Sequence, residues 1–184
     1  MKKEFYRQAI HYFAGNAIIA LLMLFGTKFA FSVSFILLIA GFALSTQLVK
    51  KAKHPAKEII LLVERDGESR LPGKGAFMLF AGMTITLFLF PDKTIALAAL
   101  IALTYGDVVS TIVGKLFGKT KIIGERTIEG SLAGMMANFF MLALFLLPGQ
   151  AILTAIAAML AEYLPTDDNV SIPLVAATAL TFLI

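Results

Sequence analysis

Asp107 lies inside the apolar run 94–114, where a carboxylate is chemically useful and energetically expensive. A charged side chain at membrane depth normally faces a polar cavity, a bound ion or a partner. On a helix, the face that carries Asp107 also carries four small or polar residues, which are Ser110, Thr111, Gly114 and Gly118. This polar stripe runs toward a lysine-rich segment. The pattern predicts a site where a metal ion and a phosphate chain meet a lipid-soluble substrate.

The next segment, 115–130, supplies cations, which are Lys115, Lys119, Lys121 and Arg126. Lysines offer point charges to phosphate oxygens, and the glycines between them let the backbone approach a ligand closely. We expect Thr127 and Ser131 to cap a helix that begins near Ile128, where a helix N-terminus favours anions. The glycine spacing fits neither a Walker A loop nor a Rossmann turn. We therefore interpret the segment as a phosphate-binding loop, with anchoring of the lysines at the inner membrane surface as the alternative.

Two further polar segments lie at 162–171 and 50–74. The first holds a cluster of polar residues on the same predicted side, Glu162, Asp167, Asp168 and Asn169, with a solvated turn as the alternative interpretation. We interpret the second as a basic amphipathic connector on the membrane surface. The alternative is that this connector contributes charged residues to the site, namely Glu64, Arg65 and Arg70.

Seven apolar runs separate these polar segments, in a chain that is 59% hydrophobic and 15% charged. The runs are 10–25, 29–49, 75–90, 94–114, 131–147, 151–160 and 172–184. Several approach the ~20 residues that cross a hydrocarbon core. Without β-barrel alternation, only helices satisfy the backbone in lipid. The sequence predicts one all-α domain over 1–184, a polytopic helical membrane protein with about seven transmembrane helices.

The first apolar run is expected to be a permanent span rather than a signal peptide. Polar or small residues interrupt it, at Gln8, His11, Gly15 and Asn16, and no small-residue cleavage site follows. For His11, a hydrogen bond to a neighbouring helix is the favoured interpretation, and a catalytic or phosphate contact is the alternative. The chain has no cysteine, which excludes disulfides and thiolate chemistry.

The distribution of charge predicts an orientation. With seven spans and a cytoplasmic N-terminus, all but Lys28 and Lys93 of the 16 lysines and arginines fall on the cytoplasmic side. All but Asp92 of the 12 acids fall there as well. Because a transporter would more naturally carry polar groups on both faces, this asymmetry favours an active site on the cytoplasmic face.

Three motifs resemble those of the polyprenol kinase family, which includes dolichol kinase, phytol kinase and CTP-dependent diacylglycerol kinase. The first motif comprises Gly106, Asp107, Ser110, Gly114, Gly118 and Lys121. The second comprises Thr127, Glu129, Gly130 and Ser131, and the third Asp168, Asn169 and Pro173. The N-terminal residues Arg7, His11 and Gly15 are similar to the first helix of that family. The resemblance covers nearly the whole chain, with Arg126 at a position where the family usually has lysine.

This resemblance implies transfer of the γ-phosphoryl group of CTP to the hydroxyl of a long-chain isoprenoid alcohol, with release of CDP. It implies that the catalytic residues are Asp107, Glu129 and Asp168. Mg²⁺ or another divalent cation would be held by Asp107, Asp168 and Asp167. CTP would be bound by Lys115, Lys119, Lys121, Arg126, Thr127, Ser131 and Asn169. Either Glu129 or Asp107 would accept the proton of the alcohol.

Two other functions are alternatives. A CTP:phospholipid cytidylyltransferase, from a related family, also uses CTP and a similar pattern of glycines and acids. The late segment TDDNVSIP lacks the arginine that is usual there, which favours the kinase. A small membrane transporter is the alternative from another class. We expect a membrane lipid alcohol and CTP as partners, and no nucleic acid; these motifs leave open the identity of the alcohol, the preference for CTP over ATP, and the oligomeric state.

Overall fold

The first two apolar runs form two long helices, α1 (Lys2–Phe25) and α2 (Thr27–Lys50), which are joined at Gly26. Gly26 has a φ of 85°, a left-handed conformation that favours glycine and lets the chain reverse between the helices. The structure, a computed structural model, describes residues 2–50 and 73–184. The predicted connector 50–74 therefore lies almost entirely outside the described residues, as do its charged residues Glu64, Arg65 and Arg70.

The fourth apolar run becomes the central rod of the bundle, a continuous helix over Lys93–Phe117. It consists of three successive segments, α5 (Lys93–Ile101), the π-helical η1 (Ala102–Asp107) and α6 (Val108–Phe117). The Asp92 carboxylate caps its N-terminus by accepting hydrogen bonds from the backbone N–H groups of Thr94 and Ile95, at 2.9 and 3.0 Å. In its most apolar stretch 78% of the residues are buried, against 17% in α2, so the rod forms the core and α2 lies at the periphery.

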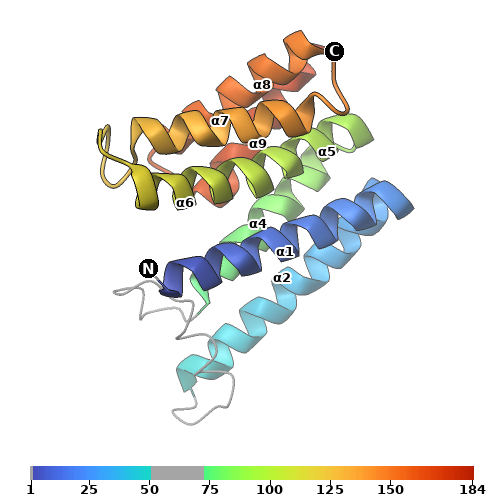
Figure 1. The fold of residues 1–184 in the computed structure, drawn as a ribbon. Helices are drawn as coiled ribbons and strands as arrows, with labels where there is room; N and C mark the ends of the chain where they lie inside the picture. The colour runs from blue at the N-terminus through green and yellow to red at the C-terminus, as the bar shows by residue number, and fades with distance from the viewer. Residues whose placement is uncertain (1, 51–72) are drawn as a thin grey trace.

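Four shorter helices pack around this rod (Figure 1). They are α4 (Lys74–Leu89), α7 (Ile128–Leu142), α8 (Pro148–Leu160) and α9 (Asp168–Thr181), with a 3₁₀ turn, η2 (Ala161–Tyr163), between α8 and α9. Thr127 caps α7 by accepting from the Gly130 N–H, and Asp167 caps α9 by accepting from the Asn169 N–H. The all-α prediction is confirmed, and each helix of the described residues coincides with one predicted apolar run.

Three helices in the described ranges are long and apolar enough to cross a membrane, Lys3–Phe25, Thr27–Thr46 and Lys93–Phe117. By contrast, α4 and α7 are apolar but contain only 16 and 15 residues. A helix of that length rises ~24 Å, less than the ~30 Å of a typical hydrocarbon core. Apolar side chains on α1 and α2 are exposed, for example Phe13 and Ile36 at 71% and 63%. The structure therefore supports membrane association.

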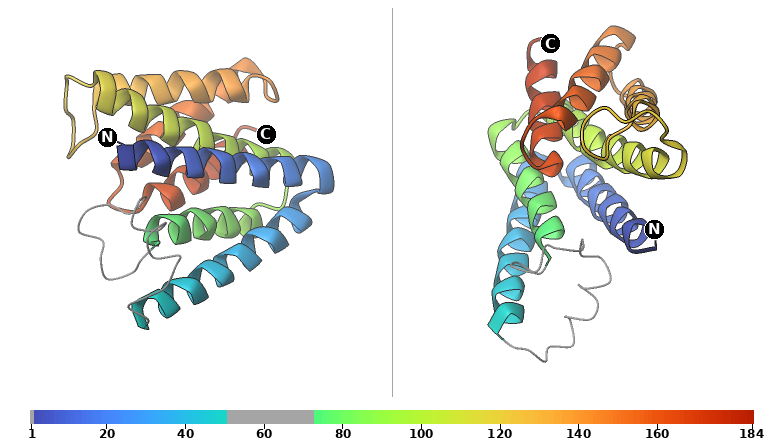
Figure 2. Two further views of the ribbon diagram at one scale, coloured as in Figure 1. Left: turned by 60° about the horizontal axis from the view of Figure 1, so that its bottom comes forward. Right: turned by 90° about the vertical axis from the view of Figure 1, so that its left-hand side faces the viewer.

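The charged connections gather at one end of the bundle (Figure 2). The N-terminus of α1, the connection between α6 and α7, and the turn between α8 and α9 lie at this end, whereas the C-terminus lies toward the other. The folded chain therefore brings the predicted polar segments 115–130 and 162–171 to the same end.

Glycines allow α6 and α7 to cross at close range. A Cβ atom on Gly130 would lie 2.6 Å from the carbonyl oxygen of Ser110, and one on Gly134 would lie 2.8 Å from that of Gly106. A Cβ on Gly118 would lie 2.6 Å from the Thr127 side chain, so this glycine also serves close packing.

Replacement of Gly130 by alanine is expected to destabilise the protein by about 1–3 kcal/mol, because backbone atoms cannot move away from the added methyl group as a flexible side chain could. Thermal unfolding in detergent measures this effect. The matched control is Gly149→Ala at the start of α8, where a Cβ would have no neighbour within 4 Å. Equal unfolding temperatures for the two variants would contradict the close contact of α6 with α7.

Candidate active site

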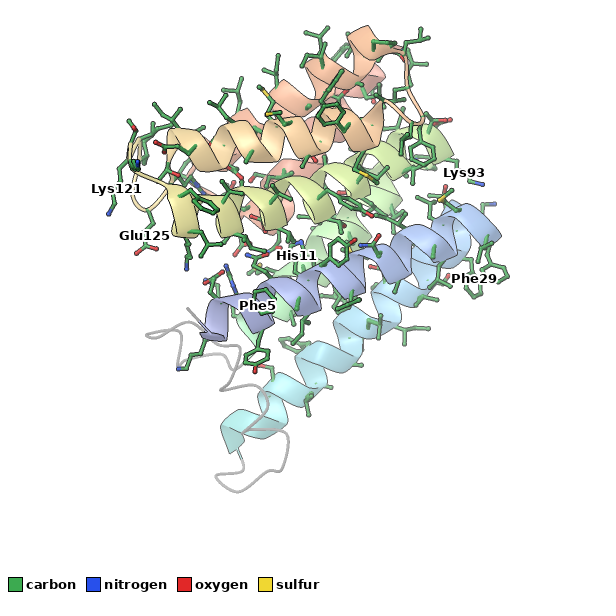
Figure 3. The ribbon with its side chains drawn as sticks, in the orientation of Figure 1. Phe5, His11, Phe29, Lys93, Lys121 and Glu125 are labelled. Atoms are coloured by element: carbon green, nitrogen blue, oxygen red, sulfur yellow. The ribbon has the colours of Figure 1, made fainter. Side chains whose placement is uncertain are left out.

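Asp107 is the last residue of the π-helical segment and is only 9% exposed. Such π-helical turns are rare and often mark functional sites. Its Oδ2 lies 3.7 Å from Nδ1 of His11 on α1. Figure 3 shows His11 on the side of α1 that faces α6. Helix α1 therefore forms one wall beside the acid.

Glu162, in the 3₁₀ turn between α8 and α9, is a second buried carboxylate, with 4% of its surface exposed. Its Oε1 accepts a hydrogen bond from Ser110 Oγ at 2.5 Å, and its Oε2 accepts one from Ser131 Oγ at 3.4 Å. The hydroxyl groups of Ser131 and Tyr163 lie 2.8 Å apart. These contacts join α6, α7 and the turn around one carboxyl group.

The negative charges of this region act on one another. Burial raises the pKa of Glu162 to about 7, and the charges of Asp107 and Asp168 add to the rise, although the Ser110 hydrogen bond opposes it. Burial also raises the pKa of Asp168, despite its hydrogen bond with Arg126, and Asp107 contributes to that rise. Three acids from three separate segments therefore share one buried neighbourhood. Perturbed carboxylates of this kind are typical of functional sites.

Arg126 supplies a positive charge to the same neighbourhood. One of its terminal nitrogens donates a hydrogen bond to Asp168 Oδ1 at 2.6 Å, and its guanidinium lies 6.0 Å from the centre of the Tyr163 ring. Burial alone lowers the pKa of Arg126, but the hydrogen bond and charge of Asp168 outweigh burial and raise it. The guanidinium is thus held beside the acids with part of its hydrogen-bonding fork available to an anion.

Replacement of Glu162 by glutamine is expected to stabilise the protein at pH 8 and to have little effect at pH 5. The folded-state pKa of Glu162 is about 7, above its ordinary value of 4.5, so its ionisation disfavours the folded state as pH rises between those values. The full difference at pH 8 is on the order of 3 kcal/mol. Thermal unfolding in detergent with a chelator present measures it. A stability difference independent of pH would contradict the buried, weakly acidic state of Glu162.

The connection between α6 and α7 closes on itself as a small hairpin, in which Lys121 and Thr127 pair as an antiparallel bridge. The Glu129 carboxylate braces this hairpin by accepting hydrogen bonds from the backbone N–H groups of Lys119 and Thr120, at 3.1 and 3.2 Å. Its own backbone N–H and those of Thr120 and Lys119 lower the pKa of Glu129. Glu129 therefore holds the loop, and its contacts are not with the three buried acids.

The predicted lysines lie in different places. Lys115 Nζ forms a 2.7 Å ion pair with Glu4 Oε2, and Glu4 also pairs with Arg7, which ties the start of α1 to the end of α6. Lys119 and Lys121 are exposed on the hairpin, and Figure 3 shows Lys121 directed away from the bundle. No ion pair within the described residues engages their ammonium groups. These two cations can therefore move toward an anion at this end.

The other predicted ligands are mostly engaged in local structure. Thr127 is 4% exposed and caps α7 as expected. The expected capping by Ser131 is wrong, because its hydroxyl turns toward Glu162 and Tyr163. Asp167 Oδ1 accepts hydrogen bonds from both the backbone and the side-chain nitrogen of Asn169, at 3.2 and 2.9 Å.

The acids suit a hard divalent cation only if further oxygen ligands are added. Within the described residues, no three His, Asp or Glu side chains form a group that could hold a metal ion by themselves. Mg²⁺ at nucleotide sites commonly uses one or two carboxylates together with phosphate oxygens. Asp107 and Asp168 are the candidates for that arrangement, since the charge of Asp107 contributes to the raised pKa of Asp168. Asp167 is less suited, since one of its oxygens caps α9.

Glu162 was not among the predicted site residues, although it belongs to the predicted polar segment 162–171. The signal in the sequence is an acid that directly follows the apolar run 151–160. From sequence alone, an acid at this position is interpreted as part of a solvent-exposed turn. The hydrogen bond with Ser110, 52 positions away in sequence, shows that the turn packs against α6 and that Glu162 is buried there.

The chain is similar over nearly its whole length to uncharacterized protein MJ1137 of Methanocaldococcus jannaschii. The two are 28% identical over an alignment that covers 95% of this chain and 91% of that protein. No protein-family profile matches the chain, and no solved structure matches it. The similarity covers most of both chains, and the name of that protein states no activity.

Proposed function

We propose that this protein is an integral membrane kinase that transfers the γ-phosphoryl group of CTP to the hydroxyl of a long-chain isoprenoid alcohol, releasing CDP. The observation that carries the proposal is the meeting of Asp107, Glu162 and Asp168 with Arg126 at one end of an apolar helical bundle. These residues lie in or beside the segments whose motifs resemble the polyprenol kinases. An acidic cluster that would hold a divalent cation, together with an arginine, suits charge neutralisation around transferring phosphate.

We also infer that each of the seven apolar runs lies in the membrane, with the N-terminus and this end of the bundle in the cytoplasm. The positive-inside distribution of lysine and arginine supports this orientation. The charged connections lie at the same end as the buried acids, where a water-soluble nucleotide would arrive. The tail of the alcohol would remain in the bilayer beside the helices.

Different residues of the chain would bind the triphosphate and the divalent cation. Arg126 would turn part of its guanidinium toward the triphosphate, and Lys119 and Lys121 would close on it from the hairpin that Glu129 braces. Asp107 and Asp168 would hold the divalent cation that accompanies the nucleotide, which when bound neutralises phosphate charge. The buried position of these groups strengthens each electrostatic contact.

Glu162 is better suited than Glu129 to accept the proton of the alcohol. A general base works best when its pKa lies near the working pH, and burial raises the pKa of Glu162 to about 7. The Glu129 carboxylate is instead occupied by backbone N–H groups of the hairpin. In the transfer, the alcohol oxygen bonds to phosphorus, the bond to the CDP oxygen breaks, and the alcohol proton passes to Glu162.

Labelled nucleotide tests the proposal on the purified protein. With γ-labelled CTP and a polyprenol, we expect label in the lipid and CDP in solution. Label from α-labelled CTP in the lipid, with release of pyrophosphate, would show a cytidylyltransferase instead. Flux of a solute into liposomes without nucleotide, and no transfer of label, would show a transporter.

A further inference from the structure

Two buried polar atoms on α1 lack a hydrogen-bond partner within the described residues. They are Oε1 of Gln8 and Nε2 of His11, on side chains that belong to residues only 1% and 8% exposed. A buried polar atom left unpaired costs about 1–3 kcal/mol, and native proteins rarely retain one without a reason. A bound ligand that supplies both contacts would remove the cost.

The two side chains lie on one face of α1, and that of His11 is next to Asp107 in the proposed active site. Gln8 and His11 are three residues apart on a helix, so their side chains lie on the same face of α1. Nδ1 of His11 lies 3.7 Å from Asp107 Oδ2. The Gln8 amide nitrogen donates to Glu4 Oε1 at 3.2 Å, which leaves its oxygen as the unpaired end.

The chemistry of these atoms selects the kind of ligand. An amide oxygen only accepts hydrogen bonds, and Nε2 of His11 is an acceptor as well, because the other ring nitrogen donates its proton to the backbone carbonyl oxygen of Leu103. Both atoms therefore disfavour phosphate oxygens, and a hydroxyl group suits them because it supplies a proton. Other faces of α1 are strongly exposed, with Ile10 at 48% and Phe13 at 71%, so a lipid tail can lie along the same helix.

We propose that Gln8 and His11 form the subsite for the hydroxyl group of the acceptor alcohol. The inference rests on the proposed kinase function and adds to it the place where the acceptor's headgroup binds. The alcohol directs its hydroxyl proton toward Gln8 Oε1 and His11 Nε2, and His11 lies next to Asp107. On transfer its proton leaves for the carboxylate cluster, because an amide cannot take it up.

The test replaces Gln8 by leucine, which keeps the approximate size and removes the acceptor. The KM for the alcohol is expected to rise about 10-fold, as for loss of one hydrogen bond, with the KM for CTP unchanged. Gln8→Met provides a second variant of similar length if the leucine protein fails to fold. Asn16→Leu is the matched control, an amide on the same helix whose oxygen is already paired with Tyr105 OH at 2.7 Å.

A binding measurement without nucleotide separates this inference from the kinase proposal. Geranylgeraniol should raise the unfolding temperature of the wild-type protein, and its methyl ether, which cannot donate a hydrogen bond, should not. The difference in unfolding temperature between the alcohol-bound and the ether-treated protein should disappear in Gln8→Leu and persist in Asn16→Leu. Equal effects of alcohol and ether on the wild type, or an unchanged KM for the alcohol in both Gln8 variants, would overturn the subsite. Alcohol-specific stabilisation without transfer from any nucleotide would uphold the subsite and overturn the kinase.

Discussion

Replacement of Asp107 by asparagine is expected to lower phosphoryl transfer about 10³-fold, because it removes a carboxylate proposed to hold the divalent cation that balances phosphate charge. The amide has nearly the same size as the carboxylate, so the helix and its contact with His11 should persist. Initial rates with γ-labelled CTP and a polyprenol measure the loss. The folded fraction is followed in parallel by thermal unfolding.

The matched control is Asp92→Asn at the opposite end of the central rod. Asparagine also caps helices well, so the hydrogen bonds to the Thr94 and Ile95 N–H groups should be kept and activity should be unchanged. Full activity in Asp107→Asn would remove the central acid from the mechanism. An equal loss in both variants would point to general damage to the rod.

Replacement of Arg126 by alanine is expected to lower kcat/KM for CTP about 10²-fold, as for loss of one strong donor to transition-state charge. It should also destabilise the fold, because the half-buried Asp168 carboxylate loses its 2.6 Å partner. Arg126→Lys should recover part of the activity, since a lysine keeps the charge but not the two-pronged geometry. Steady-state kinetics and thermal unfolding measure the two effects separately.

The double variant Arg126→Ala with Asp168→Asn distinguishes an ion pair that only supports the fold from one that also serves the reaction. Removing the unpaired acid should restore much of the lost stability, because the two residues are in direct contact. It should not restore activity if both side chains bind the nucleotide complex. Recovery of activity together with stability would assign Arg126 a structural role alone.

The helices could be predicted from the sequence because helix formation depends on residues that are close together in the chain. An apolar run bounded by charged residues must become a helix to satisfy its backbone in lipid, and the helices coincide with the predicted runs. The N-cap at Thr127 was predictable for the same reason, since capping involves residues only three apart. The lengths of the helices were less predictable. In the described ranges, only three helices are long and apolar enough to cross a membrane.

The site was partly predictable. Asp107 could be singled out because a carboxylate within an apolar run is costly wherever the run lies. The resemblance singled out Glu129 rather than Glu162, and the local sequence offered no correction, because both are acids near the end of a helix. The structure turns Glu129 toward the backbone of the hairpin and buries Glu162 against Ser110 and Ser131.

The sequence by itself therefore determined the helices of this protein and singled out an acid that required a partner, and it predicted that nearly all the charge lies on one membrane face. Hydropathy and charge are properties of individual residues, so they can be evaluated from the sequence without knowledge of the tertiary structure. Only the tertiary structure decided which acids share a neighbourhood, that Arg126 lies beside Asp168, and that α1 brings His11 to Asp107. Those relations depend on distances between segments far apart in the chain, which are set by how closely glycines let the helices pack.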